Sequence, residues 1–141
     1  MALSKQKFRE IVFQLLFSRD FSEETEGETR EMLMQQLEVP KSALREAEAR
    51  LQQIVEHLPE IDRTIAALSK DYNFDRIPRV ERSILRLGLF ELMYEPEMPG
   101  TVSISEAIRL SRKFATAEAS SFINAILDKA YQGKQATLAS V

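Results

Sequence analysis

The segment from Val80 to Tyr94 limits the fold more than any other part of this sequence. Drawn as a helix, it carries apolar residues on nearly every side, and a helix of that kind is found in the middle of a helical bundle. Gly88 stands inside it, at a cost of about 1 kcal/mol of helix propensity relative to alanine. We expect the close approach of a neighbouring helix to explain that glycine. The apolar positions are Val80, Ile84, Leu85, Leu87, Leu89, Phe90, Leu92 and Met93.

Helical periodicity continues through most of the remaining sequence, with no competing strand-like alternation. We therefore predict an all-α fold of about seven helices. The first helix is capped by Ser4 and ends near Asp20, and the second is short, with Met32, Leu33 and Leu37 facing inward. The predicted helices begin at Ser4, after the acidic stretch 21–28, at Pro40, near Pro59, near Pro78, at Ser103 and near Thr116.

Two details of the last helices follow from local sequence rules. The stretch Ser103-Ile-Ser-Glu106 fits a capping box, so we expect the sixth helix to begin there. Gly133 suits the position just past a helix C-terminus, and it predicts the end of the seventh helix. The tail 134–141 has no strong pattern and is expected to fray.

The length of the chain, 141 residues, suggests one domain. Two small helical bundles, about 1–57 and 58–133, would each be too short to stand alone, and we expect them to pack on each other. Hydrophobic residues make up 44% and charged residues 29%, which allows both a core and solubility. Because no apolar run reaches membrane-spanning length and the N-terminus lacks a signal-peptide stretch, we expect a cytoplasmic protein without membrane association.

Residue constellations typical of enzymes are nearly absent. The chain has no cysteine, which excludes disulfides, thiolate nucleophiles and cysteine zinc sites. The only histidine, His57, lies near the end of the third helix beside Pro59, where a histidine usually interacts with helix-terminal carbonyls. The four glycines are scattered, and the carboxylates lack the spacing of metal ligands. We predict a protein that is not an enzyme and holds neither metal nor cofactor.

Basic residues gather at three places, although the net charge is −3 and the pI about 5.3. A non-specific nucleic-acid binder is usually strongly basic, so RNA binding here would need a local patch. Positive charge at the start of the first helix opposes the helix dipole unless an anion binds there. The first set could instead be a solubilising terminus, and each of the other two a solvated face paired with glutamates, with Glu81 and Glu106 as candidates. The sets are Lys5, Lys7 and Arg9; Arg79, Arg82 and Arg86; and Arg109, Arg112 and Lys113.

Two phenylalanines stand near the last of these sets. Phe114 follows Arg112 and Lys113 at the end of the sixth helix, and Phe122 lies early in the seventh. Exposed rings beside cations are what single-stranded RNA recognition uses, because bases stack on them. The alternative is that both rings belong to the core, and the apolar stripe of the seventh helix favours that alternative for Phe122.

Four stretches of the sequence carry a resemblance to a known family. They are residues 7–17 (KFREIVFQLLF), 77–92 (IPRVERSILRLGLFEL), 102–114 (VSISEAIRLSRKF) and 121–129 (SFINAILDK). In order and spacing they resemble the NusB family of bacterial transcription antitermination factors. The two C-terminal stretches are specific to that family, and the first is weak alone.

The resemblance implies an all-α, non-enzymatic protein of two packed helical subdomains that binds the boxA element of nascent ribosomal RNA. It implies joint binding with a small-subunit ribosomal protein, called NusE in this role, and entry into the RNA polymerase elongation complex with other Nus factors. It assigns RNA contacts to Lys5, Lys7, Arg9, Phe114, Glu118 and Phe122, to which we add the adjacent cations Arg112 and Lys113. The residues expected to dock the ribosomal protein are Glu81 and Arg82, with Arg86 beside them on the same stripe.

The sequence departs from the family pattern at several of these positions. The N-terminal motif, Ser4-Lys-Gln-Lys-Phe-Arg9, has less arginine than is usual in the family. A family glycine is replaced by Ala115, and a second by Ala125. Glu118 stands for an aspartate, and Ser121 for a residue that is commonly basic. These departures leave the fold intact and suggest greater dependence on the protein partner.

Two other functions remain open at this stage. One is the accessory RNA-binding domain of an rRNA cytosine methyltransferase, which would need a downstream catalytic domain with cysteines, and none occurs before Val141. The other is a protein-binding helical module that has lost RNA contact, which the thinned basic motif would suit. Phe13 and Phe17, read as surface apolar residues, could also support a homodimer.

Overall fold

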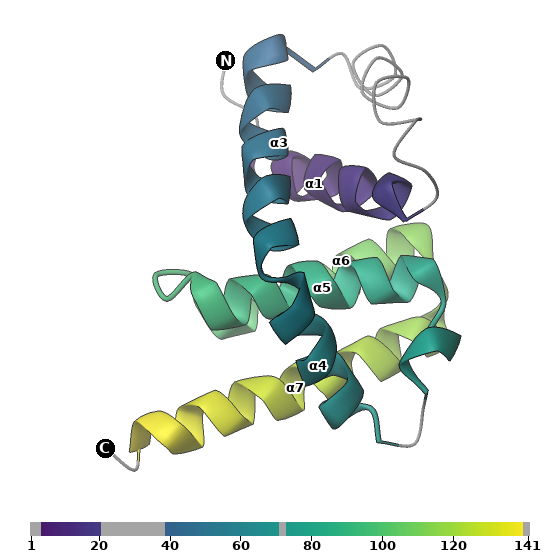
Figure 1. Ribbon diagram of the computed structural model, residues 1–141, viewed down its shortest axis with the longest axis vertical. Coiled ribbons are helices and arrows are strands. Elements are labelled where there is room, and N and C mark those ends of the chain that lie inside the picture. The colour runs from purple at the N-terminus through teal and green to yellow at the C-terminus, as the bar shows by residue number, and fades with distance from the viewer. Residues whose placement is uncertain (1–3, 21–38, 71–72, 140–141) are drawn as a thin grey trace. The chain divides into compact units, whose positions relative to one another are not determined.

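A computed structural model describes residues 4–20, 39–70 and 73–139, and these residues are helical apart from short connections. No strand occurs among them, which confirms the predicted all-α class (Figure 1). The predicted second helix, with Met32, Leu33 and Leu37, and the acidic loop before it lie outside the described residues. The elements are α1 (Lys5–Arg19), α3 (Lys41–Glu56), α4 (Leu58–Leu68), the 3₁₀ helix η2 (Phe74–Arg76), α5 (Arg79–Tyr94), α6 (Gly100–Phe114) and α7 (Ala117–Ala139).

The chain divides into two compact units, residues 1–56 and 57–141. In the first unit, α1 and α3 pack on each other through buried aliphatic side chains. The Ser4 hydroxyl caps α1 as the sequence predicts, by accepting the Lys7 backbone N–H at 3.1 Å. The buried apolar residues of this unit's helices are Ile11, Val12, Phe13, Leu15, Leu16, Leu44, Ala47 and Ile54.

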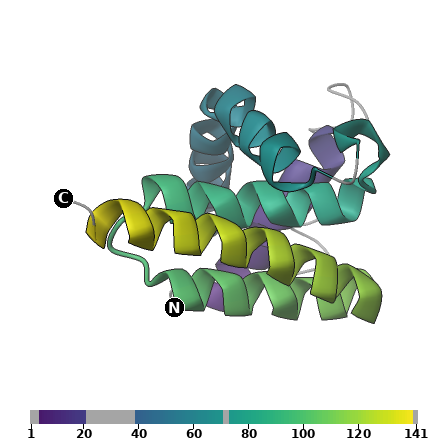
Figure 2. The ribbon, with the colours of Figure 1, turned by 90° about the horizontal axis from the view of Figure 1, so that it is seen from below.

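Helix α5 is the centre of the second unit. It contacts α4, α6 and α7, and every residue from Ser83 to Leu92 is buried. Figure 2 shows α5, α6 and α7 running alongside one another. A methyl group added at Gly88 would stand 3.0 Å from Cδ1 of Leu127 on α7, so the expected close approach of a neighbouring helix is confirmed.

The predicted start of α6 at Ser103 is wrong. The helix begins at Gly100, where the carbonyl of Pro99 accepts the N–H groups of Val102 and Ser103. Ser103 therefore lies inside the helix and is buried, and its hydroxyl donates to the Glu91 carboxylate at 3.2 Å. The serine that seemed to cap one helix instead joins α6 to α5.

The predicted end of α7 at Gly133 is also wrong, because the helix continues to Ala139. Just beyond the glycine, the Lys134 ammonium donates to the Leu92 carbonyl at 2.8 Å, near the end of α5. A cation at the C-terminus of a helix is favourable because unsatisfied carbonyls gather there. This tertiary contact supports the turn of α7 that local sequence suggested would fray.

Candidate nucleic-acid interface

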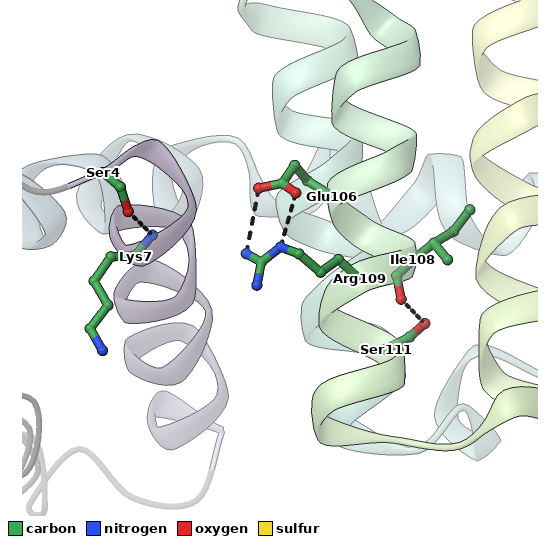
Figure 3. A network of polar contacts seen from close by, with 6 residues as sticks. All are labelled: Ser4, Lys7, Glu106, Ile108, Arg109 and Ser111. Atoms are coloured by element: carbon green, nitrogen blue, oxygen red, sulfur yellow. Dashed lines mark hydrogen bonds and ion pairs between the residues drawn. The ribbon is translucent and has the colours of Figure 1, made fainter.

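The first turn of α1 presents the N-terminal basic residues unequally. The Lys5 side chain is exposed and Lys7 is half-buried, whereas Arg9 is only 7% exposed. Lys5 and Arg9, four positions apart, share one side of the helix, and Lys7 lies on another. Figure 3 shows the Lys7 ammonium directed away from its capped backbone. Lys5 and Lys7 are therefore the accessible members of this set, and RNA contact by all three stays a prediction.

The junction of α6 and α7 carries the second group of predicted RNA contacts. Arg112, Lys113 and Glu118 are exposed, and the rings of Phe114 and Phe122 are half-buried. The Lys113 ammonium lies 5.6 Å from the centroid of the Phe114 ring, within the range of a cation–π contact. Phe122 is partly exposed, whereas a residue of the interior would be fully covered, so its ring is not wholly a core residue. The junction thus offers two exposed cations and two partly exposed rings between residues 112 and 122.

Hydrogen bonds between small side chains shape this junction. The Ala115 N–H bonds the Ser111 carbonyl at 2.8 Å and closes α6, and the Thr116 hydroxyl caps α7 by accepting the Ala119 N–H at 3.1 Å. The hydroxyl oxygens of Ser111 and Ser120 lie 2.5 Å apart and join the two helices. The backbone angle φ at Ala115 is −132°, in the negative range that residues other than glycine adopt. The turn at Ala115 therefore does not use the positive φ that glycine adopts most readily.

Arg109, the remaining basic residue of α6, forms an ion pair within its own helix. Its guanidinium donates to both carboxylate oxygens of Glu106, at 2.9 and 3.4 Å (Figure 3). This confirms the pairing that the sequence suggested for Glu106. The exposed cations at the junction are therefore Arg112 and Lys113.

The arginines of α5 that were expected to dock a protein partner are largely engaged in their own unit. Arg86 is 7% exposed and forms two hydrogen bonds to Asp62 of α4, at 2.8 and 3.0 Å. Both Arg82 and Arg86 lie over the ring of Phe74, at 5.2 and 5.8 Å from its centroid. Burial raises the pKa of Glu81, which is half-buried. The predicted partner role of Glu81, Arg82 and Arg86 stays a prediction, and Arg86 also holds α4 on α5.

His57 lies between two helices and not inside the third as predicted, because α3 ends at Glu56 and α4 begins at Leu58. Its ring stacks on that of Tyr94, with centroids 3.9 Å apart. The Tyr94 hydroxyl donates to the Glu60 carboxylate at 2.5 Å. The aromatic stack replaces the contact with helix-terminal carbonyls that local sequence suggested.

Sequence reasoning did not find Asp62, Phe74, Tyr94 or the pair Ser111 and Ser120. Asp62 and Arg86 are 24 positions apart, and Glu60 and Tyr94 are 34 apart, so no local motif relates them. The two serines sit on different helices, and only the path of the turn brings them together. The one sequence signal for the serine pair is Ser111, a polar residue on the inward face of the sixth helix near its end.

The expectation that Phe13 is a surface residue able to support a homodimer is wrong. Its side chain is only 2% exposed, and its ring stacks on that of Phe17 at a centroid distance of 6.1 Å. It is therefore a core residue and offers no surface for a second copy. The half-buried Phe17 alone remains of the pair that was read as a surface patch.

The described residues contain neither a metal-binding cluster nor a membrane-spanning helix. In the ranges 4–20, 39–70 and 73–139, no group of three or more histidine, aspartate or glutamate side chains is placed to hold a metal ion. Within the same ranges, no helix is both long and apolar enough to cross a bilayer.

Comparison with known proteins identifies the relatives of this arrangement. The family model described as the NusB family matches residues 6–132, which is most of the chain. The chain belongs to the NusB family. This confirms the resemblance carried by the sequence stretches around the central helix and the last two helices.

Curated members of the NusB family match nearly the whole chain. A transcription antitermination protein NusB of Geobacter sulfurreducens is 36% identical over 122 residues, which cover 86% of this chain and 88% of that protein. The protein of the same name in Chlamydia pneumoniae is 38% identical over 124 residues, covering 88% and 78%.

Solved structures of NusB proteins share the fold. NusB of T. maritima superposes with a TM-score of 0.78 at 28% identity, over 94% of this chain and 93% of that one. A structure of the antitermination factors NusB and NusE in complex with double-stranded RNA gives a TM-score of 0.78 at 27% identity, over 92% and 96%. That second protein is thus known with both a protein partner and RNA.

Proposed function

We propose that this chain is a non-enzymatic transcription antitermination factor that binds boxA-type RNA of ribosomal RNA transcripts together with NusE. Such a factor acts in the cytoplasm, within the RNA polymerase elongation complex and beside other Nus factors. Family membership carries the proposal, because the relatives named above are antitermination proteins and one structural neighbour holds NusE and RNA. The same relatives favour this function over the methyltransferase accessory domain.

The α6–α7 junction supports RNA as the ligand. A chain with net charge −3 needs a local basic surface to attract a phosphate backbone, and exposed Arg112 and Lys113 supply one. The partly exposed ring of Phe114, beside Lys113, can stack on an unpaired base. Because stacking needs a base free of its duplex partner, we assign a preference for single-stranded RNA to this site. Glu118 and Phe122 complete the proposed RNA surface on α7.

In the first unit, we propose separate RNA contacts in the first turn of α1. Lys5 and Lys7 are accessible for phosphate contact, and the buried Arg9 would act mainly by holding this turn. For the protein partner, we propose the face of α5 that carries Glu81 and Arg82, which Arg86 anchors through Asp62. The small number of accessible cations implies that NusE contributes much of the affinity.

The test is binding of a labelled boxA-like single-stranded RNA, with a scrambled strand and a duplex as competitors, with and without NusE. We expect sequence-selective binding that tightens with NusE and weakens with salt. Combining Lys5→Glu with Lys7→Glu should weaken it by about tenfold or more, since two phosphate contacts become repulsive. Lys41→Glu, an exposed lysine in the first turn of α3, is the matched control and should bind normally.

Two results would count against this proposal. Intact RNA binding by the double lysine variant would remove α1 from the site. Binding of NusE without RNA selectivity in any condition would favour the protein-binding module and would refute an RNA role for the whole chain.

A further inference from the structure

The hydroxyl groups of Ser111 and Ser120 form a hydrogen bond between the last two helices. Ser111 is fully buried near the end of α6, and Ser120 is half-buried near the start of α7. Their oxygens lie 2.5 Å apart. The Ser111 hydroxyl also lies 2.8 Å from the Ile108 carbonyl, as Figure 3 shows. A hydroxyl has one proton and two lone pairs. When Ser111 donates to Ile108, its oxygen can accept the proton of Ser120, at the expense of the longer 3.3 Å contact from the Ser120 hydroxyl to the Thr116 carbonyl.

The same two serines take part in the backbone contacts that define the turn. The Ser111 carbonyl accepts the N–H of Ala115, which ends α6, and the Ser120 N–H bonds the Thr116 carbonyl at 3.1 Å in the first turn of α7. A rotation at this turn would therefore break hydrogen bonds on both helices. Linked hydrogen bonds of this kind polarise one another and favour one arrangement.

The proposed RNA contacts stand directly beside this pair. Phe114 follows Ser111 by three positions, which puts both in the last turn of α6, and Phe122 follows Ser120 by two. Arg112 and Lys113 attract phosphates from many directions, so the charges alone do not orient the RNA. Base stacking requires a ring at a defined angle and distance, and it is therefore sensitive to the angle between the two helices.

We propose that the Ser111–Ser120 hydroxyl pair is a positioning element that holds the α6–α7 turn in the arrangement in which Phe114 can stack on a base. The inference rests on the proposed RNA function and adds to it the residues that orient the ring. Two alanines at these positions would fill similar space, but a contact between methyl groups has no preferred geometry and would not fix the angle between the helices. Losing the pair would leave the helices packed but would lower the fraction of molecules with the ring correctly placed, and apparent affinity falls with that fraction.

The experiment measures affinity for boxA-like single-stranded RNA with the full chain, in the presence of NusE. We expect Ser111→Ala and Ser120→Ala each to weaken RNA binding by about three- to tenfold, the range that the loss of one oriented hydrogen bond implies. Ser120→Thr keeps the hydroxyl and should restore affinity to within about twofold. Ser105→Ala, an exposed serine of the same helix, is the matched control and should bind like the unchanged chain.

A double-mutant cycle separates positioning from a general effect on folding. In a Phe114→Ala background, Ser120→Ala should weaken RNA binding further by less than about twofold, because the ring that the pair orients is gone. Affinity for NusE should not change in any of these variants. If Ser111→Ala lowers the helical content, Ser120→Ala decides the matter, since Ser120 is partly exposed and easier to replace.

The outcomes distinguish this inference from the proposed function. Loss of RNA binding by Phe114→Ala with normal binding by both serine variants would overturn the positioning role and leave the RNA function standing. An equal loss with and without Phe114, or a failure of Ser120→Thr to restore affinity, would also overturn it. If the unchanged chain shows no selective RNA binding, the RNA function itself fails and the inference fails with it.

Discussion

Tyr94 shows how one residue takes its chemical character from neighbours that its own sequence context does not reveal. Its ring stacks on His57, and its hydroxyl donates to Glu60. Burial is the main cause that raises the pKa of Tyr94 to about 12, followed by the hydrogen bond and the negative charge of Glu60, while the positive charge of Arg63 lowers it. The neutral phenol is thus held in the folded chain over a wider range of pH than usual.

This shift sets a pH dependence of stability. The folded pKa lies above the ordinary value of 10.0, so the contribution is present below pH 10.0 and is lost as the pH rises to about 12. A titration of tyrosinate ultraviolet absorbance, with Tyr94→Phe as the difference standard, should show Tyr94 ionising near pH 12. Glu60→Gln should move that ionisation to lower pH because it removes the carboxylate charge. A Tyr94 signal that already appears near pH 10.0 in the folded chain would contradict this account.

At the scale of the elements, two glycines show that the same residue type has opposite roles in neighbouring helices. Gly100 begins α6, and a methyl group added there would overlap the ring of Tyr131 on α7. Gly133 lies within α7, and a methyl group there would meet nothing within 4 Å. The first glycine allows the close packing of α6 and α7, and the second only lowers helix propensity.

These two positions make a matched pair of alanine substitutions. Gly133→Ala should raise the free energy of unfolding by roughly 0.5–1 kcal/mol, because alanine favours the helix and nothing opposes it. Gly100→Ala should lower it by about 1–3 kcal/mol, because the ring of Tyr131 must move or strain. Urea denaturation measures both, with the dependence on denaturant concentration expected to stay unchanged. A Gly100→Ala variant as stable as the original chain would mean that Tyr131 can move at no cost.

At the scale of the whole molecule, the charge balance opposes RNA binding and makes the local surface decisive. The chain carries 22 acidic and 19 basic side chains, so long-range attraction for a phosphate backbone is absent. Some of the arginines are also committed to internal pairs, as Arg86 is to Asp62 and Arg109 to Glu106. We therefore expect RNA binding to depend on the exposed cations of the proposed RNA contacts and on the partner.

The salt dependence of RNA binding tests this directly. For a single strand, the logarithm of the affinity falls with the logarithm of salt concentration by about 0.7 for each phosphate contact. Lys113→Gln removes one contact and should make the slope shallower by about 0.7. Lys129→Gln, at an exposed position of α7 remote from the turn in sequence, should leave the slope unchanged. Equal slopes for all three proteins would exclude Lys113 from phosphate contact.

Several patterns within single helices were predicted correctly, as was the close approach of a helix at Gly88, whereas the hydrogen bonds between helices were not. The apolar surround of α5 and the Ser4 cap follow from neighbours in sequence, and both were found where expected. The capping box at Ser103 failed because a buried carboxylate of α5 competes for its hydroxyl. Gly133 failed as a helix end because Lys134 reaches the last turn of α5. In the candidate site, the residue types and the pairing of Glu106 with Arg109 in one helix were predictable, whereas the burial of Arg9 depends on the folded chain.

The sequence by itself determined the helical class, the central helix and the family, because periodicity and motif order are properties of the chain read in one dimension. Tertiary structure alone decided which cations stay exposed, how Arg86 pairs with Asp62, and how Ser111 meets Ser120. The physical reason is that hydrogen bonds and burial act over a few ångströms in space. Residues far apart in sequence enter that range only after the helices pack.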